Sequence, residues 1–308
     1  MGGKMRIGII GAGAMGSLFA GRLAAAGEDV SLVEVNSAQI DAVRERGLLL
    51  TIDGKDESHV VPIGPAEIYS GSFDLVIVFT KGMYTEAAVK AASHLIGPDT
   101  LALTVQNGLG NVEMIETVAP RERIIKGMTN WPATVLGMRH VTIPGSGEVH
   151  LWPAAGGSSP QFEAVCHALD KAGLNCSADR SVDTSIWEKV SFNAALNSVA
   201  AVTGMTVGEM GDSVEAREVV FSILREALAT ASALGIAVDG ERTRASVEYA
   251  LAHHRHHKPS MLQDRLSGRP MEIDTITGAV AAEAERHGVP APVTATMARL
   301  LRLIDMRP

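Results

Sequence analysis

The chain has 308 residues, of which 46% are hydrophobic and 20% charged, and its formal net charge is −8. This length and composition predict a folded protein of about two domains, and the acidic balance argues against nucleic acid or an anionic membrane as the main partner. Two cysteines are too few for a disulfide framework, and no apolar run approaches the roughly 20 residues of a membrane-spanning helix, so we expect a cytoplasmic protein.

The first half of the chain alternates short apolar runs with helical patterns. Continuous β-branched and aliphatic runs predict buried strands, and Ser37 is predicted to cap the second helix. Alternation of this kind predicts an α/β domain with a parallel, doubly wound sheet that is covered by helices on both faces. The predicted strands are 6–10, 29–33, 74–79 and 100–105, and the predicted helices are 17–26, 37–46, 85–95 and 112–118.

The second half changes character twice. From Ile124 to Pro153 threonine, valine, glycine and proline dominate, and we expect antiparallel strands that close the sheet, followed by a helix at 160–172. Beyond about residue 180, Ala-rich helical stretches replace the strand-like runs. We therefore expect one α/β domain over residues 1–180 and an all-helical domain over 181–308. The helices predicted there are 185–202, 213–234, 242–252, 270–286 and 292–303.

A glycine-rich turn lies between the first predicted strand and the first predicted helix. In this context Gly11 allows a tight turn, Gly13 the close approach of a pyrophosphate, and Gly16 close packing of helix on strand. The helix N-terminus offers N–H groups and a positive dipole end to the phosphates. A turn without a ligand is the alternative. The sequence predicts a Rossmann-like dinucleotide-binding domain, with cofactor contacts from Gly11, Ala12, Gly13, Ala14, Met15 and Gly16.

Glu34 ends the second predicted strand. An acidic side chain at this place accepts hydrogen bonds from the adenosine ribose hydroxyls and repels a 2′-phosphate. A solvated loop carboxylate is the alternative interpretation. Taken alone, Glu34 favours NAD(H) over NADP(H) as the cofactor.

A polar stripe follows a predicted helix that is otherwise apolar nearly all round. Lys189, Asn193 and Asn197 are spaced four residues apart, which places them on one face over roughly 12 Å. Lysine is rarely buried without a partner, so this stripe should line a wet cleft or meet a counter-charge. A surface lysine with two asparagines in the core is the alternative.

A second polar segment leads from Ser260 to Glu272. Pro270 suits the first position of a helix, which would place Glu272 in the first turn. Glu272 could there do no more than complement the helix dipole. In the functional interpretation, a carboxylate, a lysine and amides from separate helices hold a carboxylate-bearing substrate and donate a proton.

Five separated motifs resemble the ketopantoate reductase (2-dehydropantoate 2-reductase) family over nearly the whole chain. They are GAGAMG at 11–16, Lys81 after the third long strand, QNG at 106–108, IWEKVSFNAALN at 186–197, and PSMLQD at 259–264 with EID at 272–274. The resemblance implies a Rossmann domain followed by a helical substrate and catalytic domain. It also implies reduction of 2-dehydropantoate to (R)-pantoate, on the way to pantothenate and coenzyme A, usually with NADPH.

The resemblance further implies roles for single residues. Lys189 corresponds to the general acid of the family, and Glu272 to the carboxylate that positions this lysine or holds the substrate hydroxyl. The residues implied in substrate binding are Asn193, Asn197, Ser260 and Asn107. Those implied in cofactor contacts, besides the glycine loop and Glu34, are Lys81, Asn107 and Glu272.

Two departures from the family pattern keep alternatives open. Tyr84 stands where the family commonly has glutamine, and Val35 stands where a basic residue suits a 2′-phosphate. An NAD-dependent D-2-hydroxyacid dehydrogenase acting on another branched or aromatic 2-oxo acid is therefore an alternative. A β-hydroxyacid dehydrogenase ranks lower because the segment from Ser260 to Glu272 fits it poorly. A non-catalytic dinucleotide sensor ranks lower because it needs no proton donor such as Lys189.

A histidine cluster at 253–257 invites a metal site, but it has no carboxylate or cysteine at ligand spacing and holds Arg255 in its midst. We therefore expect a solvated helix end there and no metal in the protein. The expected partner is a small-molecule 2-oxo acid, with neither nucleic acid nor membrane, and a homodimer is the expected assembly.

Overall fold

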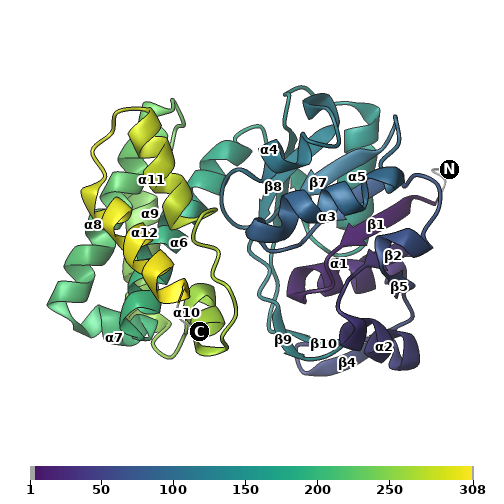
Figure 1. Ribbon diagram of the computed structural model, residues 1–308, viewed down its shortest axis with the longest axis horizontal. Helices are drawn as coiled ribbons and strands as arrows, with labels where there is room; N and C mark the ends of the chain where they lie inside the picture. Colours follow the sequence, from purple (N-terminus) through teal and green to yellow (C-terminus); the bar gives the residue numbers. More distant parts are fainter. Residues whose placement is uncertain (1–3, 307–308) are drawn as a thin grey trace. The chain divides into compact units, whose positions relative to one another are not determined.

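The computed structural model in Figure 1 describes residues 4–306, which form two compact units. The first unit comprises residues 4–106 and 111–182, and the second comprises 107–110 and 183–306. The chain thus enters the second unit for four residues before it returns to the first. The predicted division of labour, with the cofactor on one unit and the substrate on the other, stays a prediction.

A parallel-rich sheet forms the centre of the first unit. Its strands are β1 (Arg6–Ile10), β2 (Asp29–Val33), β5 (Ile63–Gly64), β6 (Leu75–Val78), β7 (Leu101–Thr104), β8 (Ile124–Thr129), β11 (Val149–Pro153) and β12 (Cys176–Ala178). Within residues 4–306 they lie in the order β12-β11-β8-β7-β6-β1-β2-β5, and only β8 and β11 pair antiparallel. The predicted fold class is confirmed.

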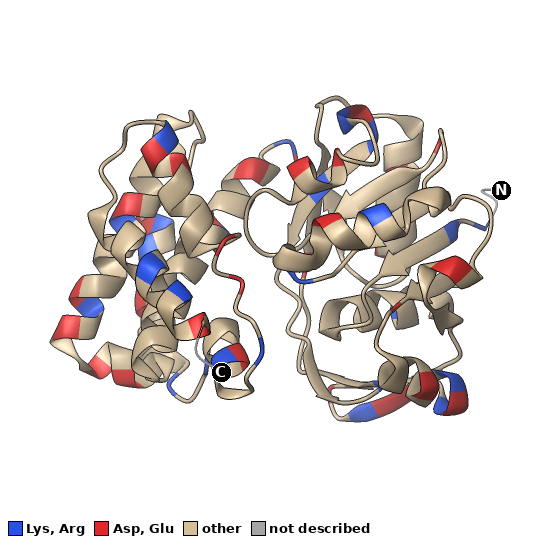
Figure 2. Cartoon of the chain, viewed as in Figure 1, with Lys and Arg blue, Asp and Glu red and all other residues tan. Residues whose placement is uncertain are grey.

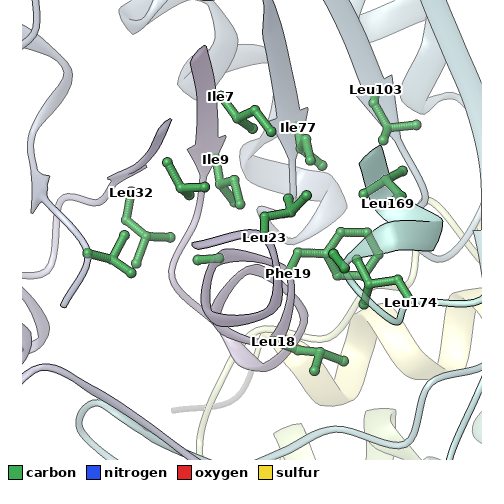
Figure 3. Packing of buried hydrophobic residues seen from close by; sticks show 14 of the residues in the cluster. Ile7, Ile9, Leu18, Phe19, Leu23, Leu32, Ile77, Leu103, Leu169 and Leu174 are labelled. Atoms are coloured by element: carbon green, nitrogen blue, oxygen red, sulfur yellow. The ribbon is translucent and has the colours of Figure 1, made fainter. Parts of the chain in front are cut away.

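Helices cover both faces of this sheet. They are α1 (Ala14–Ala25), α2 (Ser37–Arg46), α3 (Thr85–Ala91), α4 (Asn111–Ile115) and α5 (Pro160–Lys171), with the short 3₁₀ turns η1 (Ala66–Ile68), η2 (Gly82–Tyr84), η3 (Ser93–Leu95) and η4 (Arg121–Arg123). Successive residues of a strand point to opposite faces. Ile7 and Ile9 of β1 therefore pack with Phe19 of α1 (Figure 3), whereas Ile10 belongs to the core that contains Val89 of α3. Burial on both faces explains the continuous apolar run.

Two predictions for the first unit are wrong in detail. The side chain of Asn36, and not that of Ser37, caps α2 by accepting a hydrogen bond from Gln39 N–H. The stretch from 124 to 153 only partly closes the main sheet, because two of its strands join a separate sheet. That sheet has the order β4-β3-β10-β9 and consists of β3 (Leu48–Ile52), β4 (Lys55–His59), β9 (Thr134–Gly137) and β10 (His140–Ile143).

The second unit is helical, as the sequence predicts. Its helices are α6 (Val182–Thr203, which begins at the last residue of the first unit), α7 (Val207–Asp212), α8 (Val214–Ala233), α9 (Gly240–His253), α10 (Ser260–Leu266), α11 (Thr277–Arg286) and α12 (Pro292–Asp305). Figure 2 shows acidic and basic residues interspersed along these helices, as in the ion pair of Arg217 with Glu248 at 2.7 Å. Within residues 4–306, no helix combines the length and apolar character needed to span a membrane.

The helix predicted for 270–286 begins only at Thr277. Residues 271 and 272 have no regular secondary structure and residues 273–276 form turns, so Glu272 does not lie in the first turn of a helix. Tertiary partners hold this segment: Met271 N–H donates to Asp305 Oδ1 at 3.1 Å, and Arg302 binds the Asp274 carboxylate. Helix α9 ends at His253, so the histidine cluster runs beyond the helix, and the described residues contain no group of three or more side chains arranged to hold a metal.

Candidate active site

The glycine loop has the geometry that a dinucleotide requires. Gly11 has a φ of +100°, and a Cβ on Gly16 would lie 1.9 Å from Gly11 O, so both positions need glycine. A Cβ on Gly13 would meet nothing within 4 Å, and no side chain caps α1 at this residue. The loop therefore offers open space and helix N–H donors together, which fits a pyrophosphate.

Glu34 turns toward this loop. Its Oε2 accepts a hydrogen bond from Ala12 N–H at 2.8 Å, and its Oε1 accepts from Val35 N–H at 2.8 Å and Asn36 N–H at 2.9 Å. Three main-chain donors thus hold a partly buried carboxylate at the end of β2, where it retains further acceptor capacity. The structure brings Glu34 and the glycine loop together.

Lys81 lies in the turn after β6, beside the glycine loop. A Cβ on Gly11 would be 3.0 Å from the main chain of Phe79 and Thr80, which shows how closely the two turns pack. Gln106, two residues after the end of β7, donates from its side-chain nitrogen to Thr80 O at 2.5 Å. In the sequence, Gln106 belongs to the QNG motif, which by itself predicts no separate role for this glutamine. Its place after a parallel strand, next to Asn107, was the available signal.

The polar stripe of the second unit lies on α6. Lys189 and Asn193 are partly buried, and Asn197 is buried with an amide nitrogen that has no hydrogen-bond partner among residues 4–306. Desolvation by burial lowers the pKa of Lys189 to about 8, although the nearby Glu272 carboxylate acts in the opposite direction. An unsatisfied buried amide is costly, which suits a group that awaits a polar ligand.

Glu272 reaches Lys189 from the turn segment before α11. Leu109 N–H donates to Thr275 O at 2.7 Å, and a Cβ on Gly108 would lie 2.2 Å from the same oxygen. Residues 107–110 are therefore seated against the segment that carries Glu272, and Asn107 enters the second unit there. The predicted residues Asn107, Lys189 and Glu272, although far apart in sequence, belong to one unit.

Ser260 is exposed at the first residue of α10. Its connection to α6 runs through Arg265, whose guanidinium donates to Ala201 O at 2.5 Å near the end of α6. This contact places the last turn of α10 beside the last turns of α6, whereas Lys189 lies toward the N-terminal part of the stripe.

Most of the chain matches the two domain models of one known protein family. The model of the family described as "Ketopantoate reductase PanE/ApbA" matches residues 7–156, and that of its C-terminal domain matches residues 181–305. The chain belongs to this family. The predicted resemblance is therefore confirmed, and membership brings with it a nicotinamide dinucleotide as the cofactor.

Named relatives match the chain over nearly its full length. A 2-dehydropantoate 2-reductase of Streptococcus pyogenes is 31% identical over 94% of both chains. Among solved structures, a D-mandelate dehydrogenase with NADH and anilino(oxo)acetate has a TM-score of 0.91 and 30% identity over 98% of both chains. A 2-dehydropantoate 2-reductase from Geobacter metallireducens has a TM-score of 0.90 and 29% identity, covering 97% of this chain and 99% of that one.

Proposed function

We propose that this family member reduces the 2-oxo group of 2-dehydropantoate to give pantoate, with a nicotinamide cofactor. The observation that carries the proposal is the pairing of Glu272 with Lys189, which lies on α6 together with Asn193 and Asn197. A lysine whose pKa lies near neutrality, beside amides that can bind a carboxylate, is suited to reduction of a 2-oxo acid.

Proton donation is the task of Lys189. When bound, the cofactor supplies a hydride to the C2 carbon of the substrate. Lys189 Nζ donates a proton to the carbonyl oxygen as negative charge develops on it. With a pKa of about 8, the ammonium is mostly charged at pH 7 and releases its proton more readily than an ordinary lysine. Glu272 keeps the lysine from losing its proton too early, because its negative charge favours the ammonium form.

Amides and hydroxyls of the second unit orient the substrate in this proposal. Asn193 and Asn197 offer donors along α6 to the substrate carboxylate and hydroxyl. The side-chain nitrogen of Asn197, which has no hydrogen-bond partner among residues 4–306, supports this role. Asn107 and Ser260 add contacts from the 107–110 excursion and from α10. In the first unit, the glycine loop would hold the pyrophosphate, and Lys81 would contact the nicotinamide end.

NADH is the cofactor that the geometry of Glu34 favours. A fixed carboxylate near a 2′-phosphate costs about 1 kcal/mol in a wet site, and its hydrogen bond to an unphosphorylated ribose contributes about 1.5–3 kcal/mol. Arg44 donates instead to Ile63 O at 2.9 Å, and Arg46 lies 3.4 Å from the Glu45 carboxylate. These contacts support a preference for NADH over the NADPH that the family commonly uses.

A D-2-hydroxyacid dehydrogenase acting on an aromatic or branched 2-oxo acid is the second candidate. Tyr84 is half-exposed in η2, three residues after Lys81, where the family commonly has glutamine. The likeness to D-mandelate dehydrogenase, solved with NADH, favours the same candidate.

One experiment separates the two candidates. Initial rates are followed at 340 nm with 2-dehydropantoate, phenylglyoxylate and a set of aliphatic 2-oxo acids, each with NADH and with NADPH. The highest kcat/KM with 2-dehydropantoate supports the main proposal, whereas the highest value with phenylglyoxylate replaces it with the alternative. No oxidation of either cofactor with any 2-oxo acid would refute both.

The homodimer also stays a prediction, which sedimentation equilibrium would check.

A further inference from the structure

A glutamine cross-links the chain at the ends of two neighbouring strands. The side-chain nitrogen of Gln106 donates to Thr80 O at 2.5 Å and to Thr85 Oγ1 at 2.8 Å. Its side-chain oxygen accepts from Thr104 Oγ1 at 2.9 Å. Because a main-chain oxygen can only accept, the amide is restricted to this orientation.

The turn held in this way contains Lys81. Tyr84 N–H donates to Lys81 O at 2.8 Å and closes the turn, and Thr85 begins α3 directly after it. The main chain of Thr80 is also the surface on which Gly11 packs. Gln106 therefore binds Thr80, a residue that packs against the glycine loop and directly precedes Lys81.

This cross-link is costly to break. Thr85 is 0% exposed and Thr104 is 4% exposed, so water does not readily replace a lost partner of either hydroxyl. An apolar side chain of similar length in place of Gln106 would leave both hydroxyls and Thr80 O without these bonds. The simplest relief is a shift of the turn.

We propose that Gln106 is a positioning residue of the reductase site, which sets the place of Lys81 relative to the glycine loop. This inference rests on the proposed function, in which Lys81 contacts the nicotinamide end of the cofactor. Misplacement of a reacting or binding group by about 1 Å costs up to about 100-fold in rate. Gln106→Met should therefore lower kcat/KM by about 10- to 100-fold.

The test is a double-mutant cycle of Gln106→Met and Lys81→Ala. If Gln106 acts through Lys81, Gln106→Met should change kcat/KM by less than about twofold once Lys81 has been removed. Losses that multiply in the double variant would overturn the proposal. Gln161→Met, the same substitution at an exposed position of α5, is the matched control and should leave kcat/KM unchanged.

A second pair of variants keeps the test decisive if Gln106→Met does not fold. Thr85→Val keeps the shape of the side chain but removes the hydroxyl that accepts from Gln106, whereas Thr85→Ser keeps that hydroxyl. Thr85→Val should lower kcat/KM in the same direction as Gln106→Met, and Thr85→Ser should restore most of it. Equal activity of the two Thr85 variants would count against the cross-link.

Two measurements do not depend on turnover. Amide hydrogen exchange at Tyr84 should become faster in Gln106→Met but not in Gln161→Met, and unchanged exchange in Gln106→Met would overturn the proposal. The Kd of NADH, from fluorescence titration, is measured across the same cycle. If the wild-type protein reduces no 2-oxo acid, the proposed function fails. The role of Gln106 is refuted separately if Gln106→Met and Lys81→Ala change the Kd of NADH additively.

Discussion

The lowered pKa of Lys189 predicts a pH profile that an ordinary lysine would not give. Its value of about 8 lies 2.5 below the ordinary 10.5, which corresponds to about 3 kcal/mol at roughly 1.4 kcal/mol for each pKa unit. Reduction needs the ammonium, so kcat/KM for the 2-oxo acid should be level below about pH 7.5. Above about pH 8 it should fall nearly tenfold for each further pH unit.

Oxidation of the 2-hydroxy acid provides the mirror image, because it needs the neutral amine and should become faster through the same pH range. Glu272→Gln should move both midpoints to lower pH, since the carboxylate raises the pKa of Lys189. Lys189→Ala should lower kcat by roughly 10²- to 10⁴-fold and abolish the inflection. A wild-type profile for reduction that stays level up to pH 10 would refute the argument that Lys189 donates the proton.

Three further predictions concern stability and cofactor binding. Lys189→Met should raise the free energy of unfolding at pH 7 by about 1–3 kcal/mol in urea titrations. Because folding lowers the pKa of Lys189, the stability of the wild type should rise between about pH 8 and 10.5, so the advantage of Lys189→Met should shrink over this range. An advantage that is unchanged at pH 10.5 would contradict the lowered pKa of Lys189. Gly13→Val should weaken binding of NADH with little change in Tm, whereas Gly16→Ala should lower Tm because its Cβ would meet Gly11 O. Equal Tm values of the two variants would contradict the different roles of Gly13 and Gly16. Wild-type kcat/KM should favour NADH over NADPH by roughly ten- to several-hundred-fold, and this preference should vanish in Glu34→Ala but persist in Arg44→Ala; a wild-type preference for NADPH would refute it.

The elements that the sequence predicted best are those whose signal is local. Strands 6–10 and 29–33 and helix 37–46 were predicted to the residue. For strand 6–10 the reason is a continuous apolar run bounded by turn residues, which specifies a strand buried on both faces. The second sheet was missed because β3 pairs with β10, far away in sequence, and because β4 is almost wholly exposed and carries no apolar pattern.

The candidate site, too, could be predicted from the sequence only where its signal is local. The glycine loop and the stripe on α6 follow from spacing, so both could be predicted as local geometry. The three main-chain bonds of Glu34 and the cross-link by Gln106 depend on neighbouring turns, which periodicity does not report. Pro270 followed by an acidic residue is a normal signal for a helix start, yet residues 271–276 are not helical, and the side chains of Asp305 and Arg302 bind Met271 N–H and the Asp274 carboxylate.

The non-helical segment 271–276 also connects several residues of the proposed active site. Because residues 271–276 are not helical, Thr275 O accepts a hydrogen bond from Leu109 N–H; in a regular helix starting at Pro270, this carbonyl would point along the helix axis. The same non-helical segment brings the carboxylate of Glu272 close enough to Lys189 to oppose the lowering of its pKa. Residues 107–110 are thereby tied to the segment that carries Glu272, and Asn107 belongs to the same unit as Glu272 and Lys189. Directly before it, Gln106 holds the Lys81 turn of the other unit. The peptide bond between Gln106 and Asn107 therefore joins the part of the chain that would position the cofactor to the part that would donate the proton.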